Sequence, residues 1–135
     1  MSDKKDTPIK VMLVDDEAGL TTLTKMSLER SGEFIVAVEN DPRKAVERAR
    51  HLQPDILILD MVMPGMDGGD VAAQIRNTPE LAQMKLIILT ALVSGDETTG
   101  GTASIAVGGE GYRALSKPVK LELLQQTIRE ELESV

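Results

Sequence analysis

Acidic, hydroxyl and ammonium side chains follow the short apolar runs of this sequence. Asp15 and Asp16 come directly after the first run, and Asp60 comes directly after the third. Thr90 follows the fourth run, and Lys117 lies just beyond the fifth. Carboxylates gathered in one place repel one another, and a hard dication with oxygen ligands, such as Mg²⁺, stabilises them best. If the fold brings these side chains together, they predict a magnesium site.

The same side chains fit chemistry on a phosphoryl group. A carboxylate such as Asp60 can attack phosphorus and form an aspartyl phosphate. The reaction needs positive charge beside the equatorial phosphoryl oxygens, which Lys117 and the metal would supply. The hydroxyl of Thr90 would donate a hydrogen bond that exists only after phosphorylation, and the small Ala91 leaves room for the group. These residues therefore predict phosphoryl transfer to Asp60.

Each of these residues also has an ordinary structural interpretation. Asp15 and Asp16 would suit the N-terminus of a helix, and Asp60 would suit a solvated turn. Thr90 would suit a strand end, and Lys117 would suit the approach to a helix. Their joint occurrence after four apolar runs is much less expected by chance, so we favour a shared site.

Apolar runs alternate with helical periodicity along the chain. The predicted strands are Ile9–Val14, Phe34–Val38, Ile56–Leu59, Leu86–Leu89 and, more weakly, Tyr112–Leu115. The third and fourth runs contain no polar residue, which is typical of parallel strands covered on both faces. Asp41 and Pro42 suit a helix start. The last predicted helix carries an apolar stripe made of Leu121, Leu124, Ile128 and Leu132. This alternation predicts right-handed crossovers and an open, doubly wound α/β domain whose strands end at one shared edge.

One segment departs from this pattern because it is rich in glycine. Residues 95–111 hold six of the eleven glycines in the chain. The alternation predicts a helix here, yet each interior glycine costs about 1 kcal/mol relative to alanine. We therefore expect that a fourth helix, if it forms, is short or irregular and confined near Ala103–Val107.

Length and charge predict a single domain over residues 1–135, with a polar N-terminal tail at residues 1–7. The chain has 135 residues and a net charge of −7, which argues against direct nucleic-acid binding. It contains no cysteine, so we expect no disulfide and no thiolate zinc site. No signal-peptide pattern is present, and no apolar run approaches the roughly 18 residues of a membrane span. We expect a cytoplasmic protein with no membrane insertion.

Three stretches carry a resemblance to a known family. They are Val11–Asp16, Pro54–Gly68 and Lys117-Pro118. Over nearly its whole length the sequence resembles the response-regulator receiver domain of two-component signalling. The resemblance implies a chemotaxis-regulator-like, flavodoxin-like fold, with a five-stranded parallel sheet of order 2-1-3-4-5 and helices on both faces.

The resemblance also implies roles for the residues named above. Asp60 would accept a phosphoryl group from a phosphohistidine of a sensor histidine kinase or a histidine phosphotransfer protein. Thr90 would be the switch hydroxyl, and Lys117, joined to Pro118 by a cis peptide bond, would pair with the phosphate. The implied Mg²⁺ ligands are Asp15, Asp16, Asp60 and the backbone carbonyl of Val62. The output would be a change in protein–protein interactions with an unidentified downstream protein, and homodimer formation is left open.

Two departures from the family pattern concern the switch region. The position three before the lysine, often aromatic in the family, is Ala114, with Tyr112 two residues earlier. Strand parity places Tyr112 on the same face as Ala114, roughly 7 Å back along the strand. Thr90 and Lys117 are 27 positions apart, several more than is usual, and the surplus falls in the glycine-rich segment. The usual coupling between the switch hydroxyl and an aromatic residue is therefore in question, and so is the family's usual output face around the fourth helix.

A third departure concerns water near the phosphoacceptor. The positions two after Asp60 and two after Thr90 hold Val62 and Leu92, whose apolar side chains would exclude hydrolytic water. We therefore expect self-phosphotransfer and slow autodephosphorylation but no other enzymatic activity. Two alternatives stay open: a phosphorylation-independent receiver-like interaction module, and a haloacid-dehalogenase-like phosphatase. Such phosphatases usually carry a second Asp, a general acid, at the position that Val62 occupies.

Overall fold

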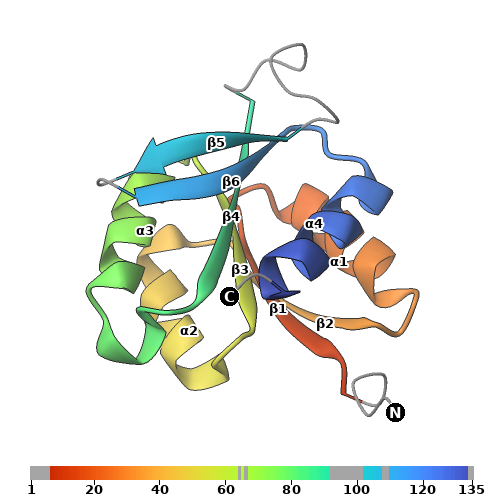
Figure 1. The fold of residues 1–135 in the computed structure, drawn as a ribbon, viewed down its shortest axis with the longest axis horizontal. Helices are drawn as coiled ribbons and strands as arrows, with labels where there is room; N and C mark the ends of the chain where they lie inside the picture. The colour runs from red at the N-terminus through yellow and green to blue at the C-terminus, as the bar shows by residue number, and fades with distance from the viewer. Residues whose placement is uncertain (1–6, 64, 66, 92–101, 108–109, 134–135) are drawn as a thin grey trace.

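The strands of the described residues form one six-stranded sheet (Figure 1). The computed structural model describes residues 7–63, 65, 67–91, 102–107 and 110–133. The strands are β1 (Ile9–Val14), β2 (Phe34–Glu39), β3 (Ile56–Asp60), β4 (Lys85–Thr90), β5 (Thr102–Val107) and β6 (Glu110–Ser116). Their order is β2-β1-β3-β4-β6-β5, with all pairs parallel except β5 and β6. The predicted parallel sheet of order 2-1-3-4-5 is confirmed, because the predicted fifth strand is β6.

Helices cover both faces of the sheet. They are α1 (Ala18–Glu29), α2 (Ala45–Leu52), α3 (Gly68–Arg76) and α4 (Leu121–Glu133), with short 3₁₀ turns at Pro42–Lys44 and Pro79–Leu81. α1 and α4 lie together on one face, and α2 and α3 lie together on the other (Figure 1). No helix in the described part of the chain is long and apolar enough to cross a bilayer.

Side chains of β3 alternate between two apolar layers. Ile56 and Ile58 pack on the face of α1 and α4, whereas Leu57 and Leu59 pack on the face of α2 and α3. All of β3 is buried, which explains its lack of polar alternation, since a central parallel strand has no solvent face. Strand β3 is therefore held rigidly from both sides, and it ends at Asp60.

The predicted helix signals near Asp41 and in the last helix are confirmed. The Asp41 carboxylate accepts a hydrogen bond from the Arg43 N–H at 3.0 Å, and Pro42 begins a helical turn that leads into α2. In α4, Leu124 and Ile128 are buried at the centre of the predicted stripe. The other two stripe residues pack against the same apolar layer from its margins.

The expectation of a short fourth helix near Ala103–Val107 is wrong, because this segment is strand β5. It pairs antiparallel with β6, with Thr102 opposite Leu115 and Val107 opposite Glu110. Thr102, Ile105 and Val107 are β-branched, and such residues prefer a pleated surface to a helix. The flanking glycines add to the cost of a helix. The other glycine-rich residues, 95–101 and 108–109, lie outside the described residues, as do Leu92 and residues 1–6 of the predicted tail.

Candidate functional site

Three carboxylates meet at the carboxyl edge of the parallel strands. Asp15 directly follows β1, and Asp60 ends β3; because Val14 pairs with Leu59 in register, the two acids leave the sheet side by side. Both are almost fully buried, with 2% and 4% of their surface exposed, whereas Asp16 is exposed. One carboxylate oxygen of each lies within 4.8 Å of the others. The fold thus brings together the acidic residues that the sequence singled out.

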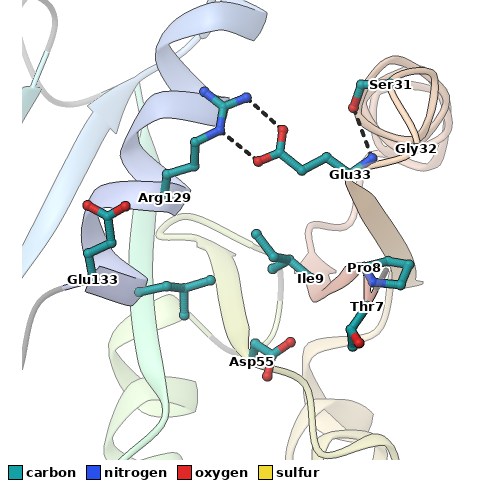
Figure 2. A pocket seen from close by; sticks show the side chains of 10 residues that line it. Thr7, Pro8, Ile9, Ser31, Gly32, Glu33, Asp55, Arg129 and Glu133 are labelled. Atoms are coloured by element: carbon teal, nitrogen blue, oxygen red, sulfur yellow. Dashed lines mark hydrogen bonds and ion pairs between the residues drawn. The ribbon is translucent and has the colours of Figure 1, made fainter. Parts of the chain in front are cut away.

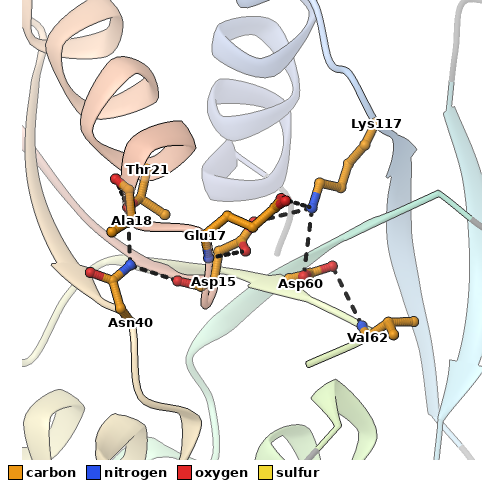
Figure 3. A network of polar contacts seen from close by, with 8 residues as sticks. All are labelled: Asp15, Glu17, Ala18, Thr21, Asn40, Asp60, Val62 and Lys117. Atoms are coloured by element: carbon orange, nitrogen blue, oxygen red, sulfur yellow. Dashed lines mark hydrogen bonds and ion pairs between the residues drawn. The ribbon is translucent and has the colours of Figure 1, made fainter. Parts of the chain in front are cut away.

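Lys117 reaches this acidic cluster from the end of β6 (Figure 3). Its Nζ atom lies 3.2 Å from Asp15 Oδ2 and 3.5 Å from Asp60 Oδ2. It also lies 3.4 Å from Oε1 of Glu17, an exposed side chain at the start of α1. The ammonium is therefore shared among three carboxylates, which leaves it able to change partners when charge is added at Asp60.

Thr90 lies at the same edge, where β4 ends between β3 and β6. It is fully buried, and its carbonyl accepts the backbone N–H of Lys117 at 3.1 Å. Ala91, directly after it, is exposed. The four strand ends predicted to share an edge are therefore adjacent. The Lys117–Pro118 peptide bond is cis, as the resemblance implies.

Asp15 does not act as the side-chain cap of α1. The N-cap of that helix is Glu17, which makes no side-chain cap hydrogen bond. Instead, Asp15 Oδ1 accepts the Glu17 N–H at 3.0 Å while Oδ2 contacts Lys117. Both oxygens of this buried carboxylate are thus oriented, one by the backbone and one by the ammonium.

The buried charges shift the pKa values of two groups. Burial, reinforced by the negative charge of Asp15, raises the pKa of Asp60 above its ordinary range, although Lys117 partly offsets this. Burial by itself would lower the pKa of Lys117, but its hydrogen bond to Asp15 and the charges of Asp15 and Asp60 raise it. Asp60 is therefore a strained, more basic carboxylate that gains from any added positive charge.

The donor set fits Mg²⁺. All three candidate ligands are carboxylate oxygens, which hard dications prefer, and exposed Asp16 leaves one side of the cluster open to solvent. Mg²⁺ usually keeps several of its waters, so a half-open site suits it. The Val62 N–H lies 3.4 Å from Asp60 Oδ1, which holds this part of the loop against the cluster. The Val62 carbonyl as a ligand stays a prediction.

Gly68 is a functional residue that the sequence interpretation quoted without a role. A Cβ atom there would lie 2.5 Å from the Asp60 carbonyl oxygen and 2.8 Å from Met61 Cα, both backbone atoms. Its N–H donates to the Met61 carbonyl at 2.8 Å. Asp67, just before it, caps α3 by accepting the Asp70 N–H at 3.0 Å. Only glycine lets α3 begin directly against the backbone of Asp60 and Met61. Its place at a helix start eight residues after Asp60 was the available signal.

Asn40 is a second residue that the sequence interpretation missed. Its Nδ2 donates to the Asp15 backbone carbonyl at 2.7 Å and to Thr21 Oγ1 at 3.0 Å (Figure 3). It thereby ties the end of β2 to the loop that carries Asp15. A polar residue directly after the second strand was the signal, since that strand end lies at the same edge.

The predicted placement of Tyr112 is confirmed. Tyr112 and Ala114 are buried in the same apolar layer, on the face of α2 and α3. The Arg76 guanidinium lies 5.2 Å from the centre of the Tyr112 ring, within cation–π range. The Arg76 side chain also donates hydrogen bonds to the carbonyls of Ala82 and Met84, at 3.1 and 2.9 Å. Tyr112 is thus held inside the fold, while the position nearer the site has only a methyl group.

The cavities formed by the described residues include two near these elements, and the larger of the two is remote from the acidic cluster. It has a volume of about 840 Å³ and lies at the opposite end of β1, beside Glu33 and Arg129 (Figure 2). Those two side chains hold each other through two contacts of 2.7 Å. The smaller cavity, about 260 Å³, is bordered by Asp15 and Lys117 and adjoins the cluster. The larger cavity is also lined by charged residues, including Asp55 and Glu133. Among the described residues, however, only Asp15, Asp16 and Asp60 bring three carboxylate oxygens within 4.8 Å of one another, so we place the functional site at the cluster.

Known proteins share this fold and about a third or less of the aligned residues of this sequence. Chemotaxis protein CheY4 of Vibrio cholerae superposes with a TM-score of 0.76 at 27% identity, covering 93% of this chain and 99% of that one. The transcriptional regulatory protein TrcR of Mycobacterium tuberculosis is 36% identical over 123 residues, 90% of this chain and 44% of that protein. The alkaline phosphatase synthesis transcriptional regulatory protein PhoP of Bacillus subtilis is 33% identical over 110 residues, which cover 81% of this chain and 42% of that protein. The chain spans about half the length of these curated relatives or slightly less.

The match extends from β1 to the last helix. The response regulator receiver domain family matches residues 11–129, a range that includes all five side chains predicted for the site. The parallel sheet, the acidic cluster and the lysine at the end of β6 have the arrangement that the resemblance implies. This chain belongs to the response regulator receiver domain family.

Proposed function

We propose that this receiver domain accepts a phosphoryl group on Asp60 and thereby switches its contacts with other proteins. Response regulators interact with histidine kinases, and receiver domains are signalling proteins rather than classical enzymes. The donor would be a phosphohistidine of such a kinase or of a histidine phosphotransfer protein. The observation that carries the proposal is the cluster of three carboxylate oxygens within 4.8 Å, with Lys117 beside it.

Transfer would exchange one bond to phosphorus for another. An Asp60 oxygen attacks phosphorus opposite the P–N bond of the phosphohistidine, and the new O–P bond forms as the P–N bond breaks. The imidazole nitrogen keeps the electron pair and takes up a proton. The raised pKa of Asp60, caused by burial and by Asp15, favours this attack because a more basic carboxylate is a better nucleophile.

Asp15, Asp16 and Asp60, with the Val62 carbonyl, would hold Mg²⁺, which receiver domains typically bind through such a cluster. When bound, the metal supplies positive charge against the carboxylates and the phosphoryl oxygens. Lys117 would supply the second positive charge, since its Nζ atom already lies 3.5 Å from Asp60 Oδ2. If the Lys117 ammonium moves towards the phosphoryl oxygens, its contacts with Asp15 and Glu17 loosen.

Thr90 would report phosphorylation to the rest of the sheet. Its hydroxyl would donate to a phosphoryl oxygen on Asp60, while its carbonyl holds the Lys117 N–H at 3.1 Å. Movement of either residue would therefore be passed to β6. A downstream protein, still to be identified, would recognise the altered surface.

Intact-mass spectrometry after treatment with acetyl phosphate and Mg²⁺ tests the proposal. We expect one added phosphoryl group in the wild-type chain and none in Asp60→Asn. Asp70→Asn is the matched control, because it removes an exposed carboxyl of α3 and should label like wild type. No uptake by a folded wild-type chain, with spectra that beryllofluoride also leaves unchanged, would favour the phosphorylation-independent interaction module instead.

We further propose that the phosphoryl group is lost slowly. Val62, two residues after Asp60, brings an apolar side chain where polar residues often assist water. The decay of the labelled mass, followed after removing acetyl phosphate, gives the lifetime directly. A Val62→Asn variant should lose the group several-fold faster, whereas loss within seconds from wild type would contradict slow autodephosphorylation.

A further inference from the structure

In the described part of the chain the sheet ends at β2 on one side and at β5 on the other, and β2 is covered by charged side chains. Val36 in β2 accepts a hydrogen bond from Lys25 Nζ at 2.8 Å and donates its N–H to Glu29 at 2.9 Å. Arg48 donates to the Val38 carbonyl at 3.1 Å. Helices α1 and α2 thus occupy the outer backbone groups of β2 with charged ends, a common protection against pairing with another strand.

The opposite edge strand, β5, has none of the usual protective residues in its sequence. Its six residues, Thr-Ala-Ser-Ile-Ala-Val, include no charge and no proline, and no strand lies beyond it among the described residues. Like β2, it presents a row of backbone groups on its outer side. Uncharged, β-prone edge strands are those that pair most readily with another strand.

The backbone groups of β6 fix which residues of β5 face outward. The Lys117 N–H bonds to the Thr90 carbonyl, so this position faces β4. Backbone groups alternate sides along a strand, which turns Glu110, Tyr112 and Ala114 towards β5. The register pairs these three with Val107, Ile105 and Ala103. The outward-facing backbone groups of β5 therefore belong to Thr102, Ser104 and Ala106.

We propose that β5 pairs with β5 of a second copy of this chain, antiparallel across a two-fold axis at Ser104. In that register Ser104 faces the partner's Ser104, and Thr102 faces the partner's Ala106. These pairs consist of outward-directed residues, so each of them exchanges both of its hydrogen bonds. The strand is self-complementary, and the contact closes after two copies.

Charge does not oppose a second copy at this edge. Each copy carries a net charge of −7, so two copies repel over much of their surface, whereas β5 brings no charged residue opposite another. The contact is small: a pair of six-residue strands falls well short of the roughly 1,600 Å² that a standard interface buries. We therefore expect a weak dimer that forms at micromolar or higher concentrations.

Sedimentation velocity over a range of protein concentrations tests this pairing with the full chain and needs no phosphoryl donor. Wild type should pass from monomer to dimer. Ser104→Pro removes the N–H at the axis without touching a β5–β6 hydrogen bond, and Ser104→Asp sets two like charges opposite each other. Each should weaken dimerisation at least about tenfold, a 1.4 kcal/mol change. Ser104→Ala keeps the N–H and should dimerise like wild type.

Cysteine cross-linking tests the register separately. The chain has no cysteine, so Ser104→Cys places one thiol per copy at the proposed axis. Opposite residues of a hydrogen-bonded antiparallel pair have Cβ atoms about 5.5 Å apart, farther than the roughly 3.5–4.5 Å of a disulfide. A short bifunctional thiol reagent should therefore cross-link this variant and leave Glu47→Cys, exposed on α2, largely monomeric.

Three results would overturn the pairing. They are a wild-type chain that stays monomeric at every concentration, a dimer indifferent to both Ser104→Pro and Ser104→Asp, and equal cross-linking of the two cysteine variants. Circular dichroism confirms that each variant is folded. Phosphoryl uptake at Asp60 is measured independently of dimerisation. Absence of a dimer therefore leaves the proposed function standing, and absence of phosphoryl uptake leaves the proposed strand pairing standing.

Discussion

A Cβ atom on Gly68 would lie 2.5 Å from the Asp60 carbonyl oxygen, closer than side-chain carbons come to backbone in folded proteins. The first residue of α3 is therefore packed directly against the backbone of the residue proposed to carry the phosphoryl group. This contact, together with the Gly68 N–H to Met61 carbonyl bond of 2.8 Å, sets where the end of β3 lies. The position of Asp60 depends on a residue that takes no part in the chemistry.

Gly68→Ala is expected to destabilise the fold and impair the site together. Its methyl group must push backbone atoms aside, which costs about 1–3 kcal/mol, and displacement of Asp60 should slow phosphoryl uptake by about tenfold or more. Urea unfolding and timed mass labelling measure the two effects. Gly19→Ala in α1 is the matched control, because nothing lies within 4 Å of its Cβ position, and it should leave uptake unchanged and stability equal or higher.

Asp60→Asn is expected to stabilise the metal-free protein at neutral pH. The folded-state pKa of Asp60 is raised by burial and by Asp15, so its ionised form costs stability. The advantage of the variant should therefore appear as pH rises through the raised pKa. It should vanish below the ordinary pKa of 3.8, where the carboxyl is protonated in both states.

Urea unfolding of Asp60→Asn in EDTA at several pH values measures this effect. Asp70→Asn, which removes an exposed carboxyl, should show no such rise. A variant less stable than wild type at neutral pH would mean that the attraction between Asp60 and Lys117 outweighs burial and the repulsion from Asp15.

Asp16→Asn is expected to weaken Mg²⁺ binding without changing metal-free stability. At ten times its dissociation constant, Mg²⁺ should stabilise the wild-type chain by about 1.4 kcal/mol through linkage, and the variant should lose most of this gain. Because Asp16 is exposed, its substitution should shift stability in EDTA by no more than about 0.5 kcal/mol. Thermal unfolding with and without Mg²⁺ measures both. Glu47→Gln, which removes the same charge on α2, should keep the full metal response.

Glu29→Gln is expected to lower stability at neutral pH but not in acid. Hydrogen bonds from Lys25 and from the Val36 N–H lower the pKa of Glu29 below its ordinary value of 4.5. The stabilisation is therefore present above pH 4.5 and is lost as pH falls through the lowered pKa. Since the pair is partly solvent-screened, we expect only about 0.5 kcal/mol. Urea midpoints from neutral to acidic pH should converge for the two proteins, and a constant gap would contradict the ionic origin.

The parallel sheet and the members of the site were readable from the sequence. Uninterrupted apolar runs such as Ile56–Leu59 predict buried parallel strands, because burial on both faces excludes polar residues. Parallel strands joined by right-handed crossovers end at one edge. Residues placed directly after the runs, such as Asp15 and Asp60, therefore had to lie near one another before any side-chain position was known.

Tertiary structure alone decided which groups touch and what replaces the fourth helix. Lys117 lies 3.2 Å from Asp15 across 102 residues of chain, and its sharing with Glu17 and Asp60 depends on how β6 docks beside β4. The close approach of Gly68 to Asp60 is likewise a contact between backbones, which composition does not reveal. In Thr102–Val107, the β-branched residues favour a strand locally, but the pairing with β6 completes it, because a non-local partner supplies hydrogen bonds that no local pattern encodes.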